Sequence, residues 1–420
     1  MKLKLYIQAT ILLSAALGYA QSIPVNSNSG TLYVSPKTIV VSISNLENSS
    51  TGKIYNDGSF YMRSNLRNDG VFSFTEKLKS GYTVFESSNN AEQQIYGDQP
   101  TNVYDVLFNK LNPTGDIELE NQLLVAGTAN FYSGIVNVKE EQGATLSFSK
   151  GAKAINASDN SYASGKVLKT ANDNFGFPIG KKGHYGYAGI LAPKKILTAI
   201  EAEYFFQNSD LDFPHTLKVA GIEQIDDQEY WVVTNQVNEE TVVLTLGWNE
   251  KTLAATFLEN EAKGLGIVRW DVAQNLWVHE GGIVDLGSKT VTLPVPAAKF
   301  GVFTFGKLKS DLEVEGDVVI YNALSPNGDG NNDYFRIDNL ERFPDNKVSI
   351  FNRWGVLVYE TSHYGTADNV FRGVSGGRVT LNKNEGLPSG TYYYILEYDK
   401  KDSSGTNRIK KAGYLHLENN

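Results

Sequence analysis

The feature that most constrains this chain is a series of very short apolar segments in its first part, each entered through a glycine turn. Segments of this kind occupy residues 29–34, 57–62 and 69–74, and the turns Asn56-Asp57-Gly58 and Asn68-Asp69-Gly70 match each other. Asn and Asp tolerate left-handed backbone, and Gly adopts it without steric cost, so each triplet predicts a corner between two strands. Further short strands are predicted at residues 117–119, 123–126, 135–138 and 145–148.

Two architectures suit strands of this length and spacing. In a β-solenoid each coil stacks on its neighbour and shields the strand edges, and the irregular period of these segments suits such rungs. A meander of hairpins within a β-sandwich gives a similar local pattern. We favour the solenoid for residues 21–170.

The remainder of the chain also predicts strands. Met is rare (2), Gly (39), Tyr (23) and Phe (20) are abundant, and no long stretch repeats apolar residues at helical spacing. The predicted class is therefore all-β. A chain of 420 residues exceeds the size at which one core keeps growing, so we expect more than one domain.

We divide the part after the solenoid into two domains. Residues 171–310 predict an antiparallel β-sandwich that is entered through an extended Phe177-Pro178 step and ends in a polar linker. Residues 311–420 predict an immunoglobulin-like β-sandwich, because about seven short strands in about a hundred residues suit that fold.

Composition excludes several classes of function. The chain has no cysteine, so disulfides, thiol nucleophiles and thiolate metal sites are excluded, and stability must come from packing and backbone ladders. The formal net charge is −9, and the paired lysines are scattered along the chain. Nucleic-acid partners are not expected, because they require clustered Lys and Arg.

The first 20 residues have the pattern of a secretory signal peptide. Lys2 and Lys4 supply a positive n-region, residues 5–17 are mostly apolar, and small residues lead to a predicted cleavage between Ala20 and Gln21. The alternative, a membrane anchor, is disfavoured because the apolar run is shorter than the ~20 residues that a spanning helix needs. No later segment is apolar enough to span, so the mature chain is expected to have no transmembrane segment.

Three motif blocks follow one another in the last quarter of the chain. They are Ser325-Pro326-Asn327-Gly328-Asp329-Gly330-Asn331-Asn332-Asp333, Ile350-Phe351-Asn352-Arg353-Trp354-Gly355 and Leu387-Pro388-Ser389-Gly390-Thr391-Tyr392-Tyr393-Tyr394. In this order and spacing they resemble the type B C-terminal sorting domain of Bacteroidetes secreted surface proteins. That domain is also known as the gliding motility-associated C-terminal domain of the type IX secretion system.

The resemblance implies a destination and partners. The domain would be the secretion signal, recognised by the type IX translocon, and a PorP/SprF-like outer-membrane protein would hold the exported chain. The chain would then pass through the periplasm to the cell surface or the medium. Two departures from the family pattern are Phe371-Arg372-Gly373, in place of a Trp-Asp-Gly-like step, and an ending that lacks a basic terminal residue.

The first motif block also raises the question of a metal. Asn327, Asp329, Asn331 and Asp333 alternate, so their side-chain oxygens could converge on Ca²⁺. The EF-hand pattern fails, because Asn332 stands where that loop needs Gly and no Glu closes it. The alternative is an Asx-rich turn whose side chains satisfy their own backbone, and we favour it.

The tryptophans have two interpretations each. Trp354 at a hairpin tip is either an exposed recognition residue or a plug over the end of the sandwich, and we favour the plug because a large aromatic gains most by burial. Trp231, Trp248, Trp270 and Trp277 fall in the middle domain and are either sugar-stacking or core residues. Their strand contexts favour the core.

Catalytic motifs are not found. His184, His215, His279, His363 and His416 are dispersed without metal-ligand spacing, and no nucleophile elbow, phosphate loop or dinucleotide fingerprint occurs. Acid pairs such as Glu201 with Glu203, or Glu239-Glu240, are ordinary in an acidic protein, although a glycosidase uses two carboxylates.

Two hypotheses remain open. The first is a non-enzymatic cell-surface protein that serves as a stalk, an adhesin or an accessory to gliding. The second is a secreted glycan-binding or glycan-degrading protein that uses the same export signal.

Overall fold

The computed structural model describes residues 25–87, 92–110, 116–195, 198–219, 221–237, 241–262, 264–294, 296–297, 299–308, 318–328, 332–366, 369–375, 386–402 and 405–419. Regular structure in these residues is almost entirely β, which confirms the predicted class. The helical elements are the single turn α1 (Glu259–Ala262) and the 3-10 turns η1 (Glu140–Gln142), η2 (Ala255–Phe257) and η3 (Leu340–Arg342). Within the described residues, no helix has the length and apolar character that a bilayer crossing requires.

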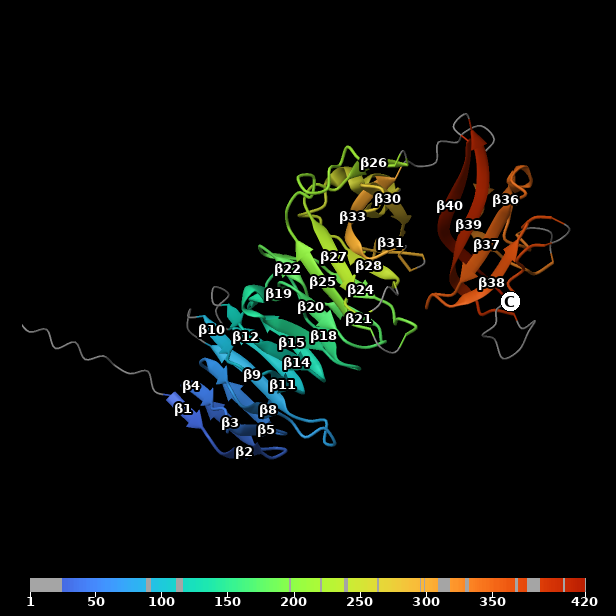
Figure 1. Ribbon diagram of the computed structural model, residues 1–420. Coiled ribbons are helices and arrows are strands. Elements are labelled where there is room, and N and C mark those ends of the chain that lie inside the picture. The colour runs from blue at the N-terminus through green and yellow to red at the C-terminus, as the bar shows by residue number, and fades with distance from the viewer. Residues whose placement is uncertain are drawn as a thin grey trace, which may run out of the picture.

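The N-terminal part is a β-solenoid of about 6 turns, so the solenoid prediction is confirmed and the meander of hairpins is wrong (Figure 1). Each coil adds one strand to each of three parallel sheets. The first sheet contains β1 (Val25–Asn28), β4 (Asn45–Asn48), β7 (Leu66–Asn68), β10 (Gln93–Tyr96), β13 (Ile117–Leu119), β16 (Val136–Val138) and β19 (Ala163–Ser164).

The other two sheets of the solenoid follow the same order. The second sheet contains β2 (Thr31–Val34), β5 (Lys53–Asn56), β8 (Val71–Ser73), β11 (Thr101–Val103), β14 (Gln122–Val125), β17 (Thr145–Phe148) and β20 (Val167–Lys169). The third sheet contains β3 (Ile39–Ser42), β6 (Ser59–Met62), β9 (Tyr82–Ser87), β12 (Asp105–Lys110), β15 (Thr128–Ser133) and β18 (Lys153–Ile155).

Alternation of side chains gives the solenoid its core. Along β12 half-buried and fully buried positions alternate strictly, as expected for strands with one face inward. Because the stacking is in register, equivalent residues meet: Phe85, Phe108 and Phe131 pair across β9, β12 and β15. The rings of Phe108 and Phe131 lie 5.0 Å apart, and all three side chains are fully buried. This aromatic ladder adds packing energy to the backbone ladder.

The turn glycines have a different role from the one predicted. Gly58 and Gly70 are not in the left-handed region. A Cβ on Gly58 would instead lie 2.4 Å from the carbonyl oxygen of Ser35, and one on Gly70 would lie 2.3 Å from that of Gly52. Glycine is therefore needed at these corners because the backbone of the preceding coil approaches too closely for a side chain.

Asparagines stack along one corner of the solenoid. Asn28, Asn48 and Asn68 pair in register on β1, β4 and β7. Each Nδ2 donates to the next Oδ1 at 2.8 Å, and Asn68 donates onward to the carbonyl oxygen of Pro100 at 2.8 Å. Asn48 and Asn68 are fully buried. This ladder satisfies buried amides that would otherwise be costly.

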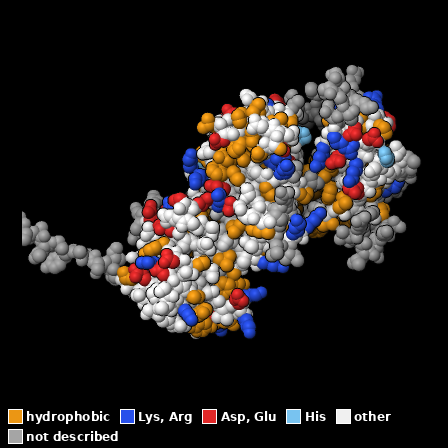
Figure 2. All heavy atoms as spheres, in the orientation of Figure 1, with side chains coloured by type: hydrophobic (Ala, Val, Ile, Leu, Met, Phe, Trp, Pro, Cys, Tyr) orange, Lys and Arg blue, Asp and Glu red, His pale blue; other side chains and the backbone are white. Residues whose placement is uncertain are grey.

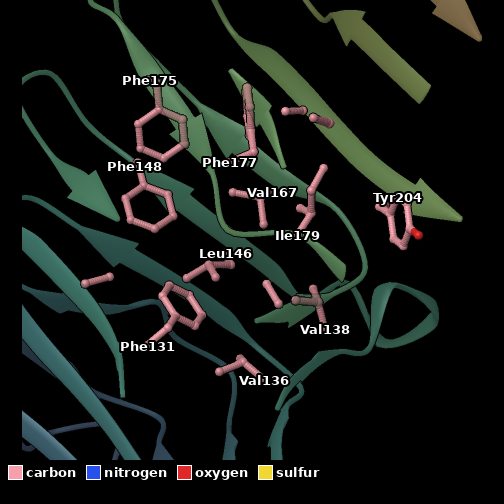
Figure 3. Packing of buried hydrophobic residues seen from close by; sticks show 14 of the residues in the cluster. Phe131, Val136, Val138, Leu146, Phe148, Val167, Phe175, Phe177, Ile179 and Tyr204 are labelled. Atoms are coloured by element: carbon pink, nitrogen blue, oxygen red, sulfur yellow. The ribbon is translucent and has the colours of Figure 1, made fainter. Parts of the chain in front are cut away.

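The second sheet continues without a break into the middle domain. β20 pairs antiparallel with β25 (Ile200–Phe205), and from there the sheet continues through β27 (Tyr230–Asn235), β33 (Gly301–Leu308), β29 (Leu265–Asp271) and β30 (Leu276–Gly281), with β26 (Ile222–Ile225) paired to β33. One apolar core spans the junction, where the rings of Phe148 and Phe175 lie 4.8 Å apart (Figure 3).

A second antiparallel sheet faces this continuation and completes the predicted middle sandwich. It contains β21 (Phe175–Phe177), β24 (Ala188–Ile190), β28 (Leu244–Gly247), β32 (Thr290–Thr292) and β31 (Ile283–Asp285), and β22 (Gly180–Lys181) pairs with β23 (His184–Tyr185). We call this five-stranded sheet the facing sheet. The predicted domain boundary at residue 170 stays a prediction, and the linker before residue 318 lies largely outside the described residues.

The tryptophans of the middle domain are core residues, as predicted. Trp231 and Trp277 are fully buried, and Trp248 and Trp270 are 7% and 5% exposed. The indole N–H of Trp231 donates to the carbonyl oxygen of Gly186 at 3.0 Å. Sugar stacking on Trp231 or Trp277 is therefore excluded in this fold.

The C-terminal domain has a core of its own. β35 (Ala323–Leu324), β40 (Gly405–Leu417), β39 (Gly390–Asp402), β37 (Asn346–Phe351) and β38 (Leu357–Ser362) form a five-stranded sheet, and β34 (Val319–Ile320) pairs with β36 (Ile337–Asp338). Side chains from both sheets share one apolar cluster. The strands agree in number with the predicted sandwich, but they divide five to two between the sheets.

A buried acid lies in the core of the middle sandwich. Glu229 accepts hydrogen bonds from the hydroxyls of Tyr204 and Thr252, the latter at 2.9 Å. Burial raises the pKa of Glu229 to about 7. Burial, followed by the charge of Glu229, also raises the pKa of Asp226 well above its ordinary value. Folding therefore makes both carboxyls harder to ionise than they are in the unfolded chain.

The asparagine ladder predicts a specific loss of stability. Asn68→Ala removes the acceptor of buried Asn48 and the donor to Pro100, so we expect unfolding to become about 2 kcal/mol easier in urea denaturation. The matched control is Asn130→Ala, which breaks the exposed Asn156–Asn130 pair. The control should change stability by less than about 0.5 kcal/mol. Equal losses for the two variants would show that the buried ladder contributes nothing beyond an exposed one.

Glu229 predicts the pH dependence of stability. Its folded pKa is raised above the ordinary 4.5, so its contribution is fully present below that pH and is lost as pH rises through about 7. Glu229→Gln should remove up to about 3 kcal/mol of this dependence and make the variant more stable than the parent at pH 8. Denaturant melts at pH 5 and pH 8 measure it, with exposed Glu141→Gln as control. A Glu229→Gln variant that keeps the parent's full pH dependence would contradict the assignment.

Candidate functional site

The first motif block forms a closed loop after β35. The amide of Ser325 donates to the carbonyl oxygen of Asn332 at 2.7 Å, and the amide of Gly328 donates to Oδ1 of Asp333 at 2.7 Å. Gly328 has a φ of 79° and Asn332 one of 54°, which only Gly and Asn adopt at low cost. Thus the side chain of Asp333 accepts a hydrogen bond from the backbone at the start of the block, and the choice between an Asx-rich turn and a metal site stays a prediction.

The structure describes only part of the residues that the sequence analysis assigned to this block and to the signal peptide. Asp329, Gly330 and Asn331 lie outside the described residues, and so do Ala20 and Gln21 at the expected cleavage site. No group of three or more acids or histidines suited to a metal ion is found in the described part of the chain. Calcium binding through Asn327, Asp329, Asn331 and Asp333 stays a prediction.

The second block is the tip of the β37–β38 hairpin. Oδ1 of Asn352 accepts the amides of Trp354 and Val356, both at 3.0 Å, and Gly355 has a φ of 72°. Asn and Gly are therefore needed to build the turn. The side chains of Arg353 and Trp354 are not needed to build the turn, and both are exposed to solvent.

Trp354 is exposed, and its predicted role as a plug is wrong. Its side chain is 62% exposed, and the guanidinium of Arg353 lies 4.3 Å from the ring centroid. The turn that Asn352 and Gly355 enforce directs the ring away from the core, whose apolar positions are already filled by other residues. The free energy that burial of the indole would gain therefore does not determine where the Trp354 side chain lies.

The third block is largely structural. Tyr392 and Tyr394 are 5% and 6% exposed, and the Tyr394 ring lies 4.9 Å from that of Phe335. Gly413 pairs with Tyr394, and a Cβ on Gly413 would lie 2.6 Å from the tyrosine hydroxyl oxygen. A tyrosine over a cross-strand glycine fills the space that the missing side chain leaves.

The chain end ties back to this block. The hydroxyl of Ser389 donates to the carbonyl oxygen of Asn419 at 2.9 Å, and Nδ2 of Asn419 donates to the carbonyl oxygen of Leu387 at 2.9 Å. The segment Phe371-Arg372-Gly373, which departs from the family pattern, packs beside this block. Phe371 is fully buried, and the carbonyl oxygen of Gly373 accepts the amide of Leu387 at 2.8 Å.

Strand register brings the three blocks to one end of the five-stranded sheet. Leu324, just before the first block, pairs with Leu417, which also pairs with Gly390 of the third block. Phe351, just before the second turn, pairs with Tyr393. We call residues 325–328, 332–333, 352–355 and 387–391 the motif end. The chain terminus also lies at this end (Figure 1).

The motif end contains two kinds of residue: buried residues that support the turns, and residues that are exposed to solvent. Tyr392 and Leu387 are buried and hold the turns in place. The residues of the motif end whose side chains or backbone are exposed to solvent are Asn327, Gly328, Asn332, Arg353, Trp354, Gly355, Pro388, Ser389 and Thr391.

The acids that the sequence singled out in the middle domain do not form a catalytic pair within the residues that the structure describes. Glu201 and Glu203 lie on β25 beside Lys166, which pairs with Glu140 at 2.9 Å and with Glu201 at 3.9 Å. Burial, followed by the charge of Glu140, raises the pKa of Glu203 to about 7. Glu239 and Glu240 lie outside the described residues. On the face shown in Figure 2, Lys and Arg side chains are interspersed with Asp and Glu.

A groove on the middle domain was missed by the sequence analysis. It is lined by residues from four separate segments: 157–159, 185–187, 245–249 and 288–290. No local motif marks them, because the pairing of β24, β28 and β32 brings the last three together.

Comparison with known families identifies the C-terminal region. Residues 318–417 match the family model of the CHU_C type IX secretion signal domain, and this range contains all three motif blocks. No curated protein and no solved structure matches the chain. A type IX secretion signal implies contact with the secretion machinery and export to the cell surface or extracellular space. The chain therefore carries, at residues 318–417, a member of the type IX secretion signal domain family.

Proposed function

We propose that this is a non-enzymatic surface protein that its C-terminal domain delivers through the type IX secretion system, and whose solenoid and middle sandwich are the displayed part. The observation that carries the proposal is the convergence of the three motif blocks on one end of a domain with its own core. A module that folds by itself can present the same surface whatever precedes it.

The motif end is the surface that we assign to the translocon. Its turns are fixed by Asn352, Asp333 and Gly355, so the exposed groups are held in place before any partner arrives. Arg353 and Trp354 combine a cation with a large aromatic surface, and Arg and Trp are the residue types that most often dominate binding energy at interfaces. A PorP/SprF-like outer-membrane protein would contact the same end after passage through the periplasm.

The displayed part suits a structural or adhesive role. The solenoid and the middle sandwich share a continuous second sheet and one core, so they form an extended body that does not depend on disulfides. We assign no catalytic role to Glu201 of β25, which lies beside Lys166 in a surface ion-pair group, or to Glu229, which precedes β27 and is buried against Tyr204 and Thr252.

Removal of residues 311–420 should separate export from folding. The remaining chain retains its core, so we expect it to fold, with a cooperative melt, but to accumulate in the periplasm. Cell fractionation with detection of the chain in the periplasm, outer membrane and medium measures the outcome. Appearance of the truncated chain outside the cell would reject the assignment.

Trp354→Ala tests the motif end itself. Because the side chain is 62% exposed, the substitution should change stability by less than about 0.5 kcal/mol while it lowers the exported fraction. Tyr414→Ala is the matched control, since it removes a 51% exposed aromatic from the face of β40 in the same domain. If both variants are exported as well as the parent, Trp354 is not part of the recognised surface.

A further inference from the structure

A groove of about 710 Å³ lies on the middle domain, far in sequence from the motif end. Its floor is the outer side of the facing sheet, and its walls come from the segment before β19 and from the ends of β28 and β32. Its volume falls within the range of ligand sites, about 300 to 1,000 Å³. The lining comes from the four segments 157–159, 185–187, 245–249 and 288–290.

Tyr187 lies flat on a floor of glycines. A Cβ on Gly189 would lie 2.5 Å from its hydroxyl oxygen, one on Gly247 would lie 3.0 Å from its Cβ, and one on Gly176 would lie 3.1 Å from Cε2. Gly176 and Gly189 pair with each other in the facing sheet. Three strands therefore have glycine, which lacks a side chain, beneath the ring. The ring forms a flat aromatic surface within the groove.

Asp159 is held in a fixed position on the wall. Its carboxylate accepts the amide of Tyr185 at 3.0 Å and Nζ of Lys251 at 3.0 Å, and Nδ2 of Asn249 lies 3.4 Å away. Burial tends to raise the pKa of Asp159, but the Tyr185 amide and Lys251 outweigh it and lower the pKa below its ordinary value. The groove thus contains an ionised acceptor whose orientation is set before a ligand binds.

The charges of the groove are balanced. Asp159 pairs with Lys251, and Lys289 pairs with Glu250 at 2.8 Å. A phosphate or carboxylate ligand would need a cation that is not already neutralised, and the charged lining residues offer none. A purely apolar ligand would displace water from Asp159, Asn249 and the hydroxyls of Ser158 and Thr290 without offering these polar groups a hydrogen bond in return.

We propose that this groove binds a neutral saccharide, with the Tyr187 ring stacked against the apolar face of a sugar and with Asp159 and Asn249 bonded to its hydroxyls. Aromatic rings offer a flat apolar face, and a sugar offers C–H groups on one face with hydroxyls around its rim. Trp248 contributes the remaining aromatic edge. The inference goes beyond export, because the groove belongs to the displayed part and shares no residue with the motif end.

The test uses the purified mature chain and a glycan array that contains neutral and acidic oligosaccharides. We expect binding to one or more neutral glycans, which titration calorimetry then quantifies with the best array ligand. Tyr187→Ala should weaken that affinity by about tenfold or more. Tyr132→Ala, which removes a 65% exposed tyrosine from the solenoid, is the matched control and should leave it unchanged.

A second variant guards against a folding defect. Asp159→Asn keeps the shape of the wall but removes the charge, and it should also weaken binding, with the melt of each variant recorded. Absence of binding to every neutral glycan, binding to acidic glycans alone, or equal affinities for Tyr187→Ala and Tyr132→Ala would overturn the proposal. Because binding is measured on purified protein, its failure leaves the export assay unaffected.

Discussion

The antiparallel pairing of β20 with β25 is the interaction that joins the solenoid to the middle sandwich and on which both depend. Stacked parallel strands leave a row of unpaired N–H and C=O groups at each end of a solenoid, and such an edge invites association. Here the last strand of the second sheet pairs directly with the first long strand of the sandwich, Val167 with Ala202. The ladder that ends the solenoid therefore starts the next domain, and the shared core around Phe148 and Phe175 follows from it.

Close stacking of coils decides which small and polar residues the solenoid needs. Adjacent strands lie about 4.8 Å apart, so corners on successive coils meet backbone to backbone. Gly58 is required there for space, and buried Asn68 is required because only a side chain that both donates and accepts can continue a ladder from one coil to the next. The residues that indicated turns therefore do lie at corners, as predicted. They are needed there because of the neighbouring coil and not because of the backbone conformation of the turn.

The sequence predicted what depends on local pattern and missed what depends on pairing. Alternation and turn residues were enough for the all-β class, the solenoid and the buried tryptophans. The exposure of Trp354 depends on the turn that Asn352 imposes, and a burial argument based on residue type alone does not include that constraint. The groove around Tyr187 could not be predicted from the sequence for a different reason. The glycines beneath the ring belong to strands whose register is fixed only in the folded structure.

The motif blocks of the C-terminal domain combine two kinds of information. Tyr394 and Gly413 fit each other within the sheet, so a match at such positions reports the fold. Arg353 and Trp354 are exposed at the hairpin tip and the packing of the domain does not require them, which is why we propose them for recognition. Exposure separates these two kinds of position. For that reason the contact that we propose with the translocon is to be tested first at the few motif residues whose side chains the domain itself does not use.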